Sequence, residues 1–315
     1  MSNSGTQEPM IWGVLLHLSY NMWADRDAPD WHEHVSYRPY LRFDENLWDD
    51  LLHQIANAGG NMIVIDLGDG VAYESHPEIA VEGAWSPSKL RDELAKVRDL
   101  GLEPIPKLNF SASHDAWLGP YSRCVSTDGY YAVCRDLIAE TVELFDGPRF
   151  FHLGMDEETA EHQRHYEYVV IRQHDLWWRD LFFYVDEVER AGSQAWMWSD
   201  YVWHHPDLFY ERMPTTILQS NWHYRADFDL STERVQAFLG LDKHGCDQVP
   251  TGSNWVVKEN LPDMVRFCAQ HIAPERLKGY LQTVWKPTLE SCRDRHEEAI
   301  AALRQAREVH EELHR

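Results

Sequence analysis

The sequence predicts a single α/β domain in which eight parallel strands alternate with helices and close into a (β/α)8, or TIM, barrel. Apolar segments of strand length recur along the 315 residues, and helical segments lie between them. Four predicted helices end at a glycine shortly before the next strand, at Gly59-Gly60, Gly101, Gly192 and Gly245. Glycine adopts the left-handed conformation that ends a helix and turns the chain back toward a sheet. Unusual polar and aromatic residues follow the strands, where active sites of such barrels lie.

The predicted strands are short runs of mainly apolar residues. They cover residues 11–18, 62–66, 103–108, 150–153, 194–198, 216–219, 248–251 and 278–284. An open, doubly wound sheet is the alternative arrangement of such strands and helices. No Gly-x-Gly-x-x-Gly motif follows the first strand, so the closed barrel is favoured. We expect no cofactor.

The helix boundaries follow from capping residues. Asp44 caps the first helix, whose apolar face carries Leu47 and Ile55. Ser86-Pro87 begins the second helix, where the missing N–H of proline costs nothing. Residues 1–10 are expected to be disordered or extended, which leaves 11–315 for the barrel. Later helices are predicted at about 130–144, 175–190, 206–213 and 235–243, and a long polar helix follows the last strand.

The charge balance restricts the partners. The chain has 29 basic and 52 acidic residues, a net charge of −23, and no basic stripe, so we expect no nucleic acid or anionic membrane partner. No apolar run is long enough to span a bilayer. The five cysteines form no Cys-x-x-Cys pair and no secretion signal is visible, so a cytoplasmic location is expected. Nothing in the sequence indicates an oligomeric state.

The fourth predicted strand ends in a cluster of acids. Gly154 interrupts its apolar run, and Asp156, Glu157 and Glu158 follow. Neighbouring like charges repel, and burial raises the pKa of the least solvated carboxyl group. One carboxyl can then stay protonated while another is ionised, as acid/base chemistry on a glycosidic oxygen requires. The alternative is a solvated acidic loop.

Other strand ends add groups that suit a sugar ligand. A sugar ring has an apolar face, which an indole can cover, and an edge of hydroxyls, which polar side chains can bind. A tryptophan follows each of the last four predicted strands, and polar residues accompany several of them. The candidates are Asn109, His114, Trp198, Asp200, Trp222, Tyr224, Trp255 and Trp285.

Histidine pairs suggest a metal-dependent hydrolase of the amidohydrolase type as a rival. The candidate ligands are His32-Glu33-His34 and His204-His205. That chemistry would place His-x-His at the end of the first strand. Here the first group lies far beyond that strand, so a site without metal is favoured. His152, inside an apolar strand, is expected to be a hydrogen-bonded structural residue.

Three segments resemble glycoside hydrolase family 20, the β-N-acetylhexosaminidases. Residues 152–157 (HLGMDE) resemble the family's His-x-Gly-Gly-Asp-Glu motif. Some branches of the family have Met in place of the second Gly, as this chain does. Residues 198–200 (WSD) are similar to the Trp-acid-acid sequence that ends the family's fifth strand. Residues 279–285 (GYLQTVW) are similar to its last strand, which ends in a tryptophan that stacks on the sugar.

The resemblance implies retaining hydrolysis of a terminal β-linked N-acetylhexosamine with assistance from the substrate. Glu157 would be the general acid and base, and Asp156 would orient the 2-acetamido group, whose carbonyl attacks C1. Tyr224 would bind that carbonyl, and His114 would tune Glu157. Trp198, Trp222 and Trp285 would form the walls of the pocket.

Both acids can face one pocket only if the backbone changes course before them. Adjacent side chains of an extended strand point to opposite faces. The strand is therefore expected to end or kink between Gly154 and Glu157.

The sequence also departs from the family pattern. The family places an arginine near the end of the first strand to hold sugar hydroxyls, but residues 11–23 contain none. Pro287 stands where many members have an acid, and Lys286 or Arg38 are the available substitutes for the arginine. A barrel that binds a sugar without cleaving it is therefore an alternative, beside the metal-dependent hydrolase.

Overall fold

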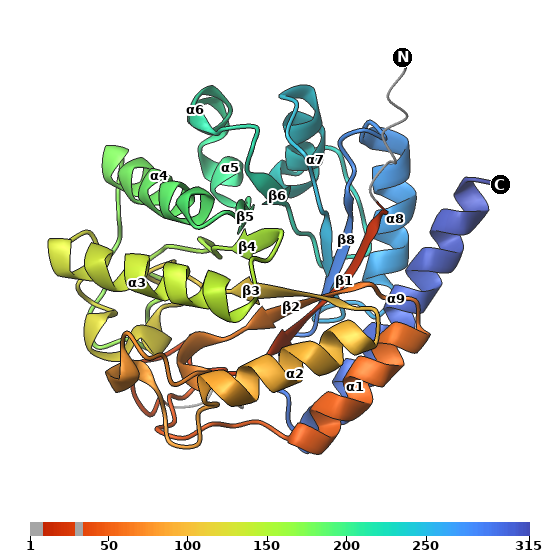
Figure 1. The fold of residues 1–315 in the computed structure, drawn as a ribbon. Coiled ribbons are helices and arrows are strands. Elements are labelled where there is room, and N and C mark those ends of the chain that lie inside the picture. The colour runs from red at the N-terminus through yellow and green to blue at the C-terminus, as the bar shows by residue number, and fades with distance from the viewer. Residues whose placement is uncertain (1–8, 29–33) are drawn as a thin grey trace, which may run out of the picture.

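In the computed structural model, which describes residues 9–28 and 34–315, eight parallel strands form one sheet (Figure 1). Their order is β6-β5-β4-β3-β2-β1-β8-β7, so neighbours in sequence are neighbours in space. The strands are β1 (Ile11–His17), β2 (Met62–Asp66), β3 (Glu103–Lys107), β4 (Phe150–His152), β5 (Gln194–Trp198), β6 (Leu218–Ser220), β7 (Thr251–Ser253) and β8 (Gly279–Thr283).

The first and last strands of this order also meet. Parallel bridges join Gln219 to Gln248 and Trp222 to Thr251. The N–H of Val249 donates to the carbonyl of Gln219 at 2.9 Å, and that of Thr251 to Asn221 at 3.0 Å. The sheet therefore closes on itself, which confirms the predicted (β/α)8 barrel.

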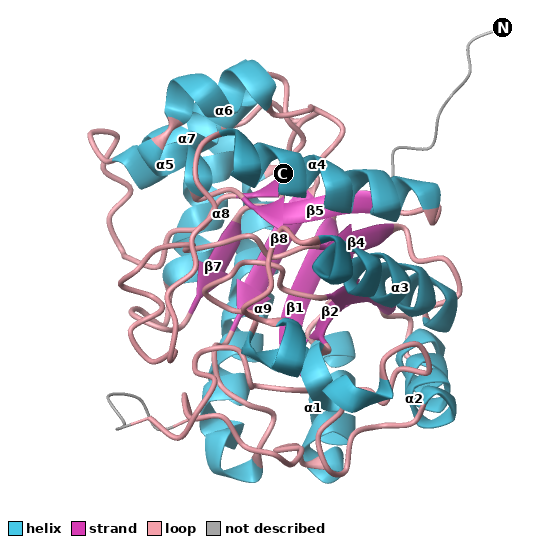
Figure 2. Cartoon of the chain, turned by 90° about the vertical axis from the view of Figure 1, so that its left-hand side faces the viewer, coloured by secondary structure: helices cyan, strands magenta, loops and turns pink. Residues whose placement is uncertain are grey.

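Helices surround the strands on the outside (Figure 2). The last of them lies beside both α1 and α8 and completes the ring. No helix of the described ranges has both the length and the apolar character needed to cross a membrane. The helices are α1 (Glu45–Asn57), α2 (Pro87–Asp99), α3 (Asp128–Leu144), α4 (Asp175–Arg190), α5 (Tyr201–His204), α6 (Pro206–Arg212), α7 (Glu233–Lys243), α8 (Asn260–His271) and α9 (Arg293–Leu313).

The predicted caps are present. The Asp44 side chain accepts the N–H groups of Asn46 and Leu47, and the Ser86 side chain accepts that of Lys89. Helices α5 and α8 were not delimited from the sequence, and the expectation for residues 1–10 falls largely outside the described residues. Predicted strands six and seven were placed two to three residues too early. Small or polar residues make up β7 entirely, so the apolar pattern that locates the other strands is missing there.

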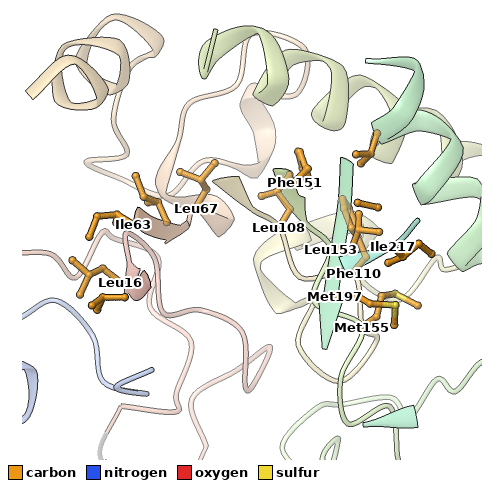
Figure 3. Close-up of a cluster of buried hydrophobic side chains, with 14 of the residues drawn as sticks. Leu16, Ile63, Leu67, Leu108, Phe110, Phe151, Leu153, Met155, Met197 and Ile217 are labelled. Carbon is orange, nitrogen blue, oxygen red and sulfur yellow. The ribbon is translucent and has the colours of Figure 1, made fainter. Parts of the chain in front are cut away.

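Successive side chains along each strand point alternately outward and inward, so the apolar side chains form two layers. Side chains that face outward belong to one cluster with apolar residues of the helices, and Figure 3 shows Leu16, Ile63 and Phe151 of this cluster. The intervening residues, such as Leu15 and Val64, fill the barrel interior with other inward-facing side chains. The interior is therefore a packed core, and a ligand can bind only above it.

A polar layer lies at the carboxyl ends of the first four strands. His17, Asp66, Lys107 and His152 are paired in register and are all buried. The Lys107 ammonium donates to Asp66 Oδ2, and His17 Nδ1 lies 3.4 Å from the same oxygen. Burial would raise the pKa of Asp66, but its interactions with Lys107 and His17 together outweigh burial and lower the pKa. This ionic layer is the last interior layer before the loops.

Candidate active site

The chain leaves β4 through a sharp kink that carries the acids. Gly154, Met155 and Glu157 all have positive φ, at 69°, 73° and 52°. The two non-glycine residues cost of order 1–3 kcal/mol each in this conformation, so surrounding contacts must hold them. The kink turns Asp156 and Glu157 into the same cavity. The predicted break between Gly154 and Glu157 is therefore confirmed.

Side chains from neighbouring strands stabilise the kink. His152 Nδ1 accepts the N–H of Gly154 at 3.0 Å, the structural role expected for this histidine. Asn109 Oδ1 accepts the N–H of Met155 at 3.1 Å, and its Nδ2 donates to Asp156 Oδ1 at 2.8 Å. Asn109 is buried and is not among the described residues that line the cavity. It therefore positions Asp156 from behind.

Asp200 supports the second acid in a similar way. Its Oδ2 accepts the backbone N–H of Glu157 at 2.9 Å, and its side chain is buried. Burial, together with the charges of Asp156 and Glu157, raises the pKa of Asp200 to about 7. Asp200 thus holds the backbone of Glu157 and does not line the cavity among the described residues.

Glu158, the third acid, is turned away from the cavity. It forms an ion pair with Arg172 and accepts the backbone N–H groups of Ala112 at 3.0 Å and Arg172 at 2.7 Å. These contacts tie the loop after β4 to the loop after β3. Only two of the three consecutive carboxylates are therefore available for chemistry.

His114 bridges the two remaining acids. Its Nδ1 lies 3.4 Å from Asp156 Oδ1, and its Nε2 lies 3.6 Å from Glu157 Oε2. Burial lowers the pKa of His114, but the charge and hydrogen bonding of Asp156, together with the charge of Glu157, outweigh burial and raise the pKa to about 9. Burial likewise opposes ionisation of Asp156, yet His114 and Asn109 hold its pKa below the usual range. An ionised Asp156 beside a protonated His114 is the state expected at neutral pH.

The other face of Glu157 meets a histidine that the sequence analysis missed. His162 Nε2 lies 3.4 Å from Glu157 Oε1, and its Nδ1 lies 2.8 Å from Thr159 Oγ1. The residue comes from the irregular loop between β4 and α4. No strand-end rule locates such a residue, because its position depends on the path of the loop.

Aromatic side chains line the cavity, which measures about 370 Å³. All four tryptophans predicted at strand ends reach it, although Trp255 is partly exposed at the rim. The loop after β1 adds two aromatic residues that were not proposed as site residues, although they too follow a strand. The aromatic lining comprises Tyr20, Trp23, Trp198, Trp222, Tyr224, Trp255 and Trp285.

Contacts among these rings fix their orientations. Trp222 stacks on Tyr224 with centroids 4.9 Å apart and planes at 24°. Trp285 Nε1 donates to the Tyr224 hydroxyl at 3.0 Å, and the Tyr20 hydroxyl donates to the carbonyl of Trp285 at 2.7 Å. Burial raises the pKa of Tyr224, so its hydroxyl keeps its proton as a donor.

Charged residues surround the cavity mouth, but they are not the proposed substitutes for the missing arginine. Neither Lys286 nor Arg38 belongs to the described lining, and Arg38 pairs with Asp27 at 2.9 Å. The loop after β4 and the segment after β6 supply the charges instead. These residues are Glu161, His162, Arg164, His165, Arg225 and Arg234.

The groups that could bind a metal ion are the acids themselves. His114, Asp156 and Glu157 each offer a ligand atom within 4.8 Å of the others. The raised pKa of His114 means that a proton competes with a metal for this ring. Of the sequence candidates, His204 and His205 are exposed around the end of α5, His34 has its Nε2 3.5 Å from Cys292 Sγ, and His32-Glu33 falls outside the described residues.

The fold and site define a parallel barrel with two adjacent acids in an aromatic cavity, and solved structures share this fold. A β-N-acetylhexosaminidase from Bacteroides fragilis superposes with a TM-score of 0.64 at 12% identity, covering 94% of this chain and 65% of that one. Streptomyces plicatus β-hexosaminidase, in a complex with N-acetylglucosamine, gives 0.64 at 13%, covering 95% and 63%. Dispersin B gives 0.57 at 15%, covering 84% and 95%.

These similarities establish the fold. The chain spans 54–65% of the length of the first three hexosaminidase structures it matches. No family model and no curated protein sequence matches the chain. The function of the chain is therefore inferred from its fold and from the geometry of its site.

Proposed function

We propose that the chain is a retaining exo-glycosidase that removes a terminal β-linked N-acetylhexosamine with the help of the substrate's own acetamido group. The observation that supports this most directly is the placement of Asp156 and Glu157 in one aromatic cavity, with His114 between them. The shared fold with β-N-acetylhexosaminidases and the HLGMDE segment agree with it.

In the proposed reaction, Glu157 donates a proton to the glycosidic oxygen as the bond from C1 to that oxygen breaks. The acetamido carbonyl oxygen attacks C1 and forms an oxazolinium ion. Water then attacks C1, Glu157 takes its proton, and the carbonyl oxygen leaves. This is the substrate-assisted exception to the usual two-carboxylate scheme.

The electrostatics of the site suit these roles. The low pKa of Asp156 keeps it ionised, so it can orient the acetamido N–H and balance the positive oxazolinium ion. The Tyr224 hydroxyl can donate to the acetamido carbonyl. The buried ionic layer of His17, Asp66 and Lys107 closes the barrel interior. A cavity that is closed at its base favours cleavage at the end of a chain.

Replacing the proposed acid tests the assignment. Glu157→Gln keeps the side-chain shape but cannot shuttle a proton, so kcat/KM on an aryl β-N-acetylglucosaminide should fall at least ~100-fold. Glu189→Gln, an exposed position on α4, is the matched control. Unchanged activity of Glu157→Gln would remove Glu157 from the mechanism.

Titration with a thiazoline mimic of the oxazolinium ion separates the alternatives. Tight binding without turnover of any glycoside would indicate a barrel that binds sugars without cleaving them, which the missing first-strand arginine favours. Stoichiometric zinc in the purified protein, bound by His114, Asp156 and Glu157, would indicate the metal-dependent hydrolase.

A further inference from the structure

Two arginines at the cavity mouth have no anionic partner. Arg225 and Arg234 line the cavity, yet neither guanidinium has an ion pair or hydrogen bond to any residue in the described part of the chain. Most other arginines are paired, among them Arg123, Arg135, Arg149, Arg172 and Arg293. With a net charge of −23, the chain has an excess of carboxylates, so two unpaired cations at one site need a reason.

The position of Arg234 is fixed by stacking. Its guanidinium carbon lies 4.4 Å from the ring centroid of Trp203 and 5.0 Å from that of Trp222, which also lines the cavity. Trp203 is itself held, because its Nε1 donates to Asn221 Oδ1 at 2.9 Å. Stacking on an aromatic face leaves the N–H groups at the guanidinium edge available to a ligand.

Helix stability does not explain this arginine. Arg234 is the second residue of α7. The positive end of the helix dipole disfavours a cation there. The pKa of the nearby His223 is lowered by burial; Asp227 opposes this shift, and the charges of Arg234 and Arg225 add to it, so both arginines lie close enough to act on this ring.

Negative charge elsewhere in the cavity is already compensated. Asp156 is paired with His114, and Glu157 lies between His114 and His162. Glu161, which also lines the cavity, lies 3.9 Å from Arg164. The unbalanced charge is therefore on the side of the mouth that carries Arg225 and Arg234.

We propose that Arg225 and Arg234 form an anion subsite, and that the preferred substrate carries a carboxylate, sulfate or phosphate beside the N-acetylhexosamine linkage. Guanidinium groups bind such anions through charge-assisted hydrogen bonds, about twice as strong as those to a neutral hydroxyl. The anion can be an ester on the terminal sugar or the carboxylate of an acidic sugar next to it. This inference deepens the proposed function and rests on it.

The test compares kcat/KM on three substrates. These are an aryl β-N-acetylglucosaminide, its 6-O-sulfate, and a disaccharide of N-acetylglucosamine β-linked to glucuronic acid. We expect at least one acidic substrate to be preferred, and Arg225→Gln/Arg234→Gln to reduce its kcat/KM at least ~10-fold more than that of the neutral substrate. Arg304→Gln, an exposed position on α9, is the matched control.

Two results would overturn the subsite. One is a wild-type preference for the neutral substrate. The other is an equal loss on all three substrates in the double variant, which would mean that the arginines bind hydroxyls. The acidic substrate whose kcat/KM falls in the double variant shows whether the anion is an ester on the terminal sugar or the carboxylate of a neighbouring sugar.

A binding measurement keeps this inference separate from the proposed hydrolysis. Wild-type protein and the double variant are titrated with N-acetylglucosamine, its 6-sulfate and the acidic disaccharide. Tighter binding of an acidic ligand that is lost in the double variant supports the subsite even if no glycoside is cleaved. Weaker or equal binding of both acidic ligands refutes it, whatever the activity.

Discussion

The ion pair between His114 and Asp156 should make stability depend on pH in a way that His114→Gln abolishes. The pKa of His114 rises from 6.5 to about 9 on folding, mainly because Asp156 attracts the protonated ring despite burial. This difference corresponds to roughly 3 kcal/mol. The depressed pKa of Asp156 reflects the same interaction and is not added to it.

The sign follows from the direction of the shift. A group whose pKa is higher in the folded protein contributes its full stability below the unfolded value of 6.5 and loses it as the pH rises through about 9. The free energy of unfolding of the wild type should therefore fall by roughly 3 kcal/mol more than that of His114→Gln between pH values of about 6 and about 9.5.

Urea unfolding at a series of pH values measures this difference. His53→Gln, at an exposed position of α1, controls for the loss of a histidine and should follow the wild type. Parallel pH curves for the wild type and His114→Gln would refute the reasoning, since the two residues would then not form a charged pair. The same variant should also lower kcat/KM, because His114 contacts both proposed catalytic acids.

Two further predictions concern the kink and its support. Gly154→Ala places a Cβ 2.1 Å from Asn109 Oδ1 at a φ of 69°, so we expect a loss of ~2–4 kcal/mol in urea unfolding together with most activity. Gly129→Ala, with nothing within 4 Å, is the control and should be neutral or stabilising. Asp200→Asn keeps an acceptor for the Glu157 N–H and should retain kcat/KM within ~3-fold near pH 6, whereas Asp200→Ala should lose ~10-fold. Equal losses in the two Asp200 variants would contradict a role through this hydrogen bond.

Much of the fold was readable from local sequence patterns. Glycine endings such as Gly101 and caps such as Asp44 and Ser86 occur where the structure has helix boundaries. The fourth-strand acids and the strand-end tryptophans were found in the same way, because parallel strands deliver their carboxyl ends to one edge of a barrel. Strands β6 and β7 were misplaced because each has only three residues, of which Leu218 is the only large apolar one, so their position depends on the neighbouring strands.

The roles within the site required the tertiary structure. The family resemblance singled out Asp156 and Glu157 among the three acids, and the structure shows why Glu158 is not available: it is held in an ion pair with Arg172. Asn109 and Asp200 were expected to face a ligand, but their hydrogen bonds place them behind the two acids.

The sequence by itself determined an eight-stranded barrel with acids and indoles at one end, because strand and helix periodicity are local properties of the chain. Only the tertiary structure decided which side chains hold the two acids in place and which loop residues, His162, Arg225 and Arg234 among them, complete the cavity. Loop conformation depends on contacts between residues far apart in sequence, and no local pattern records those contacts.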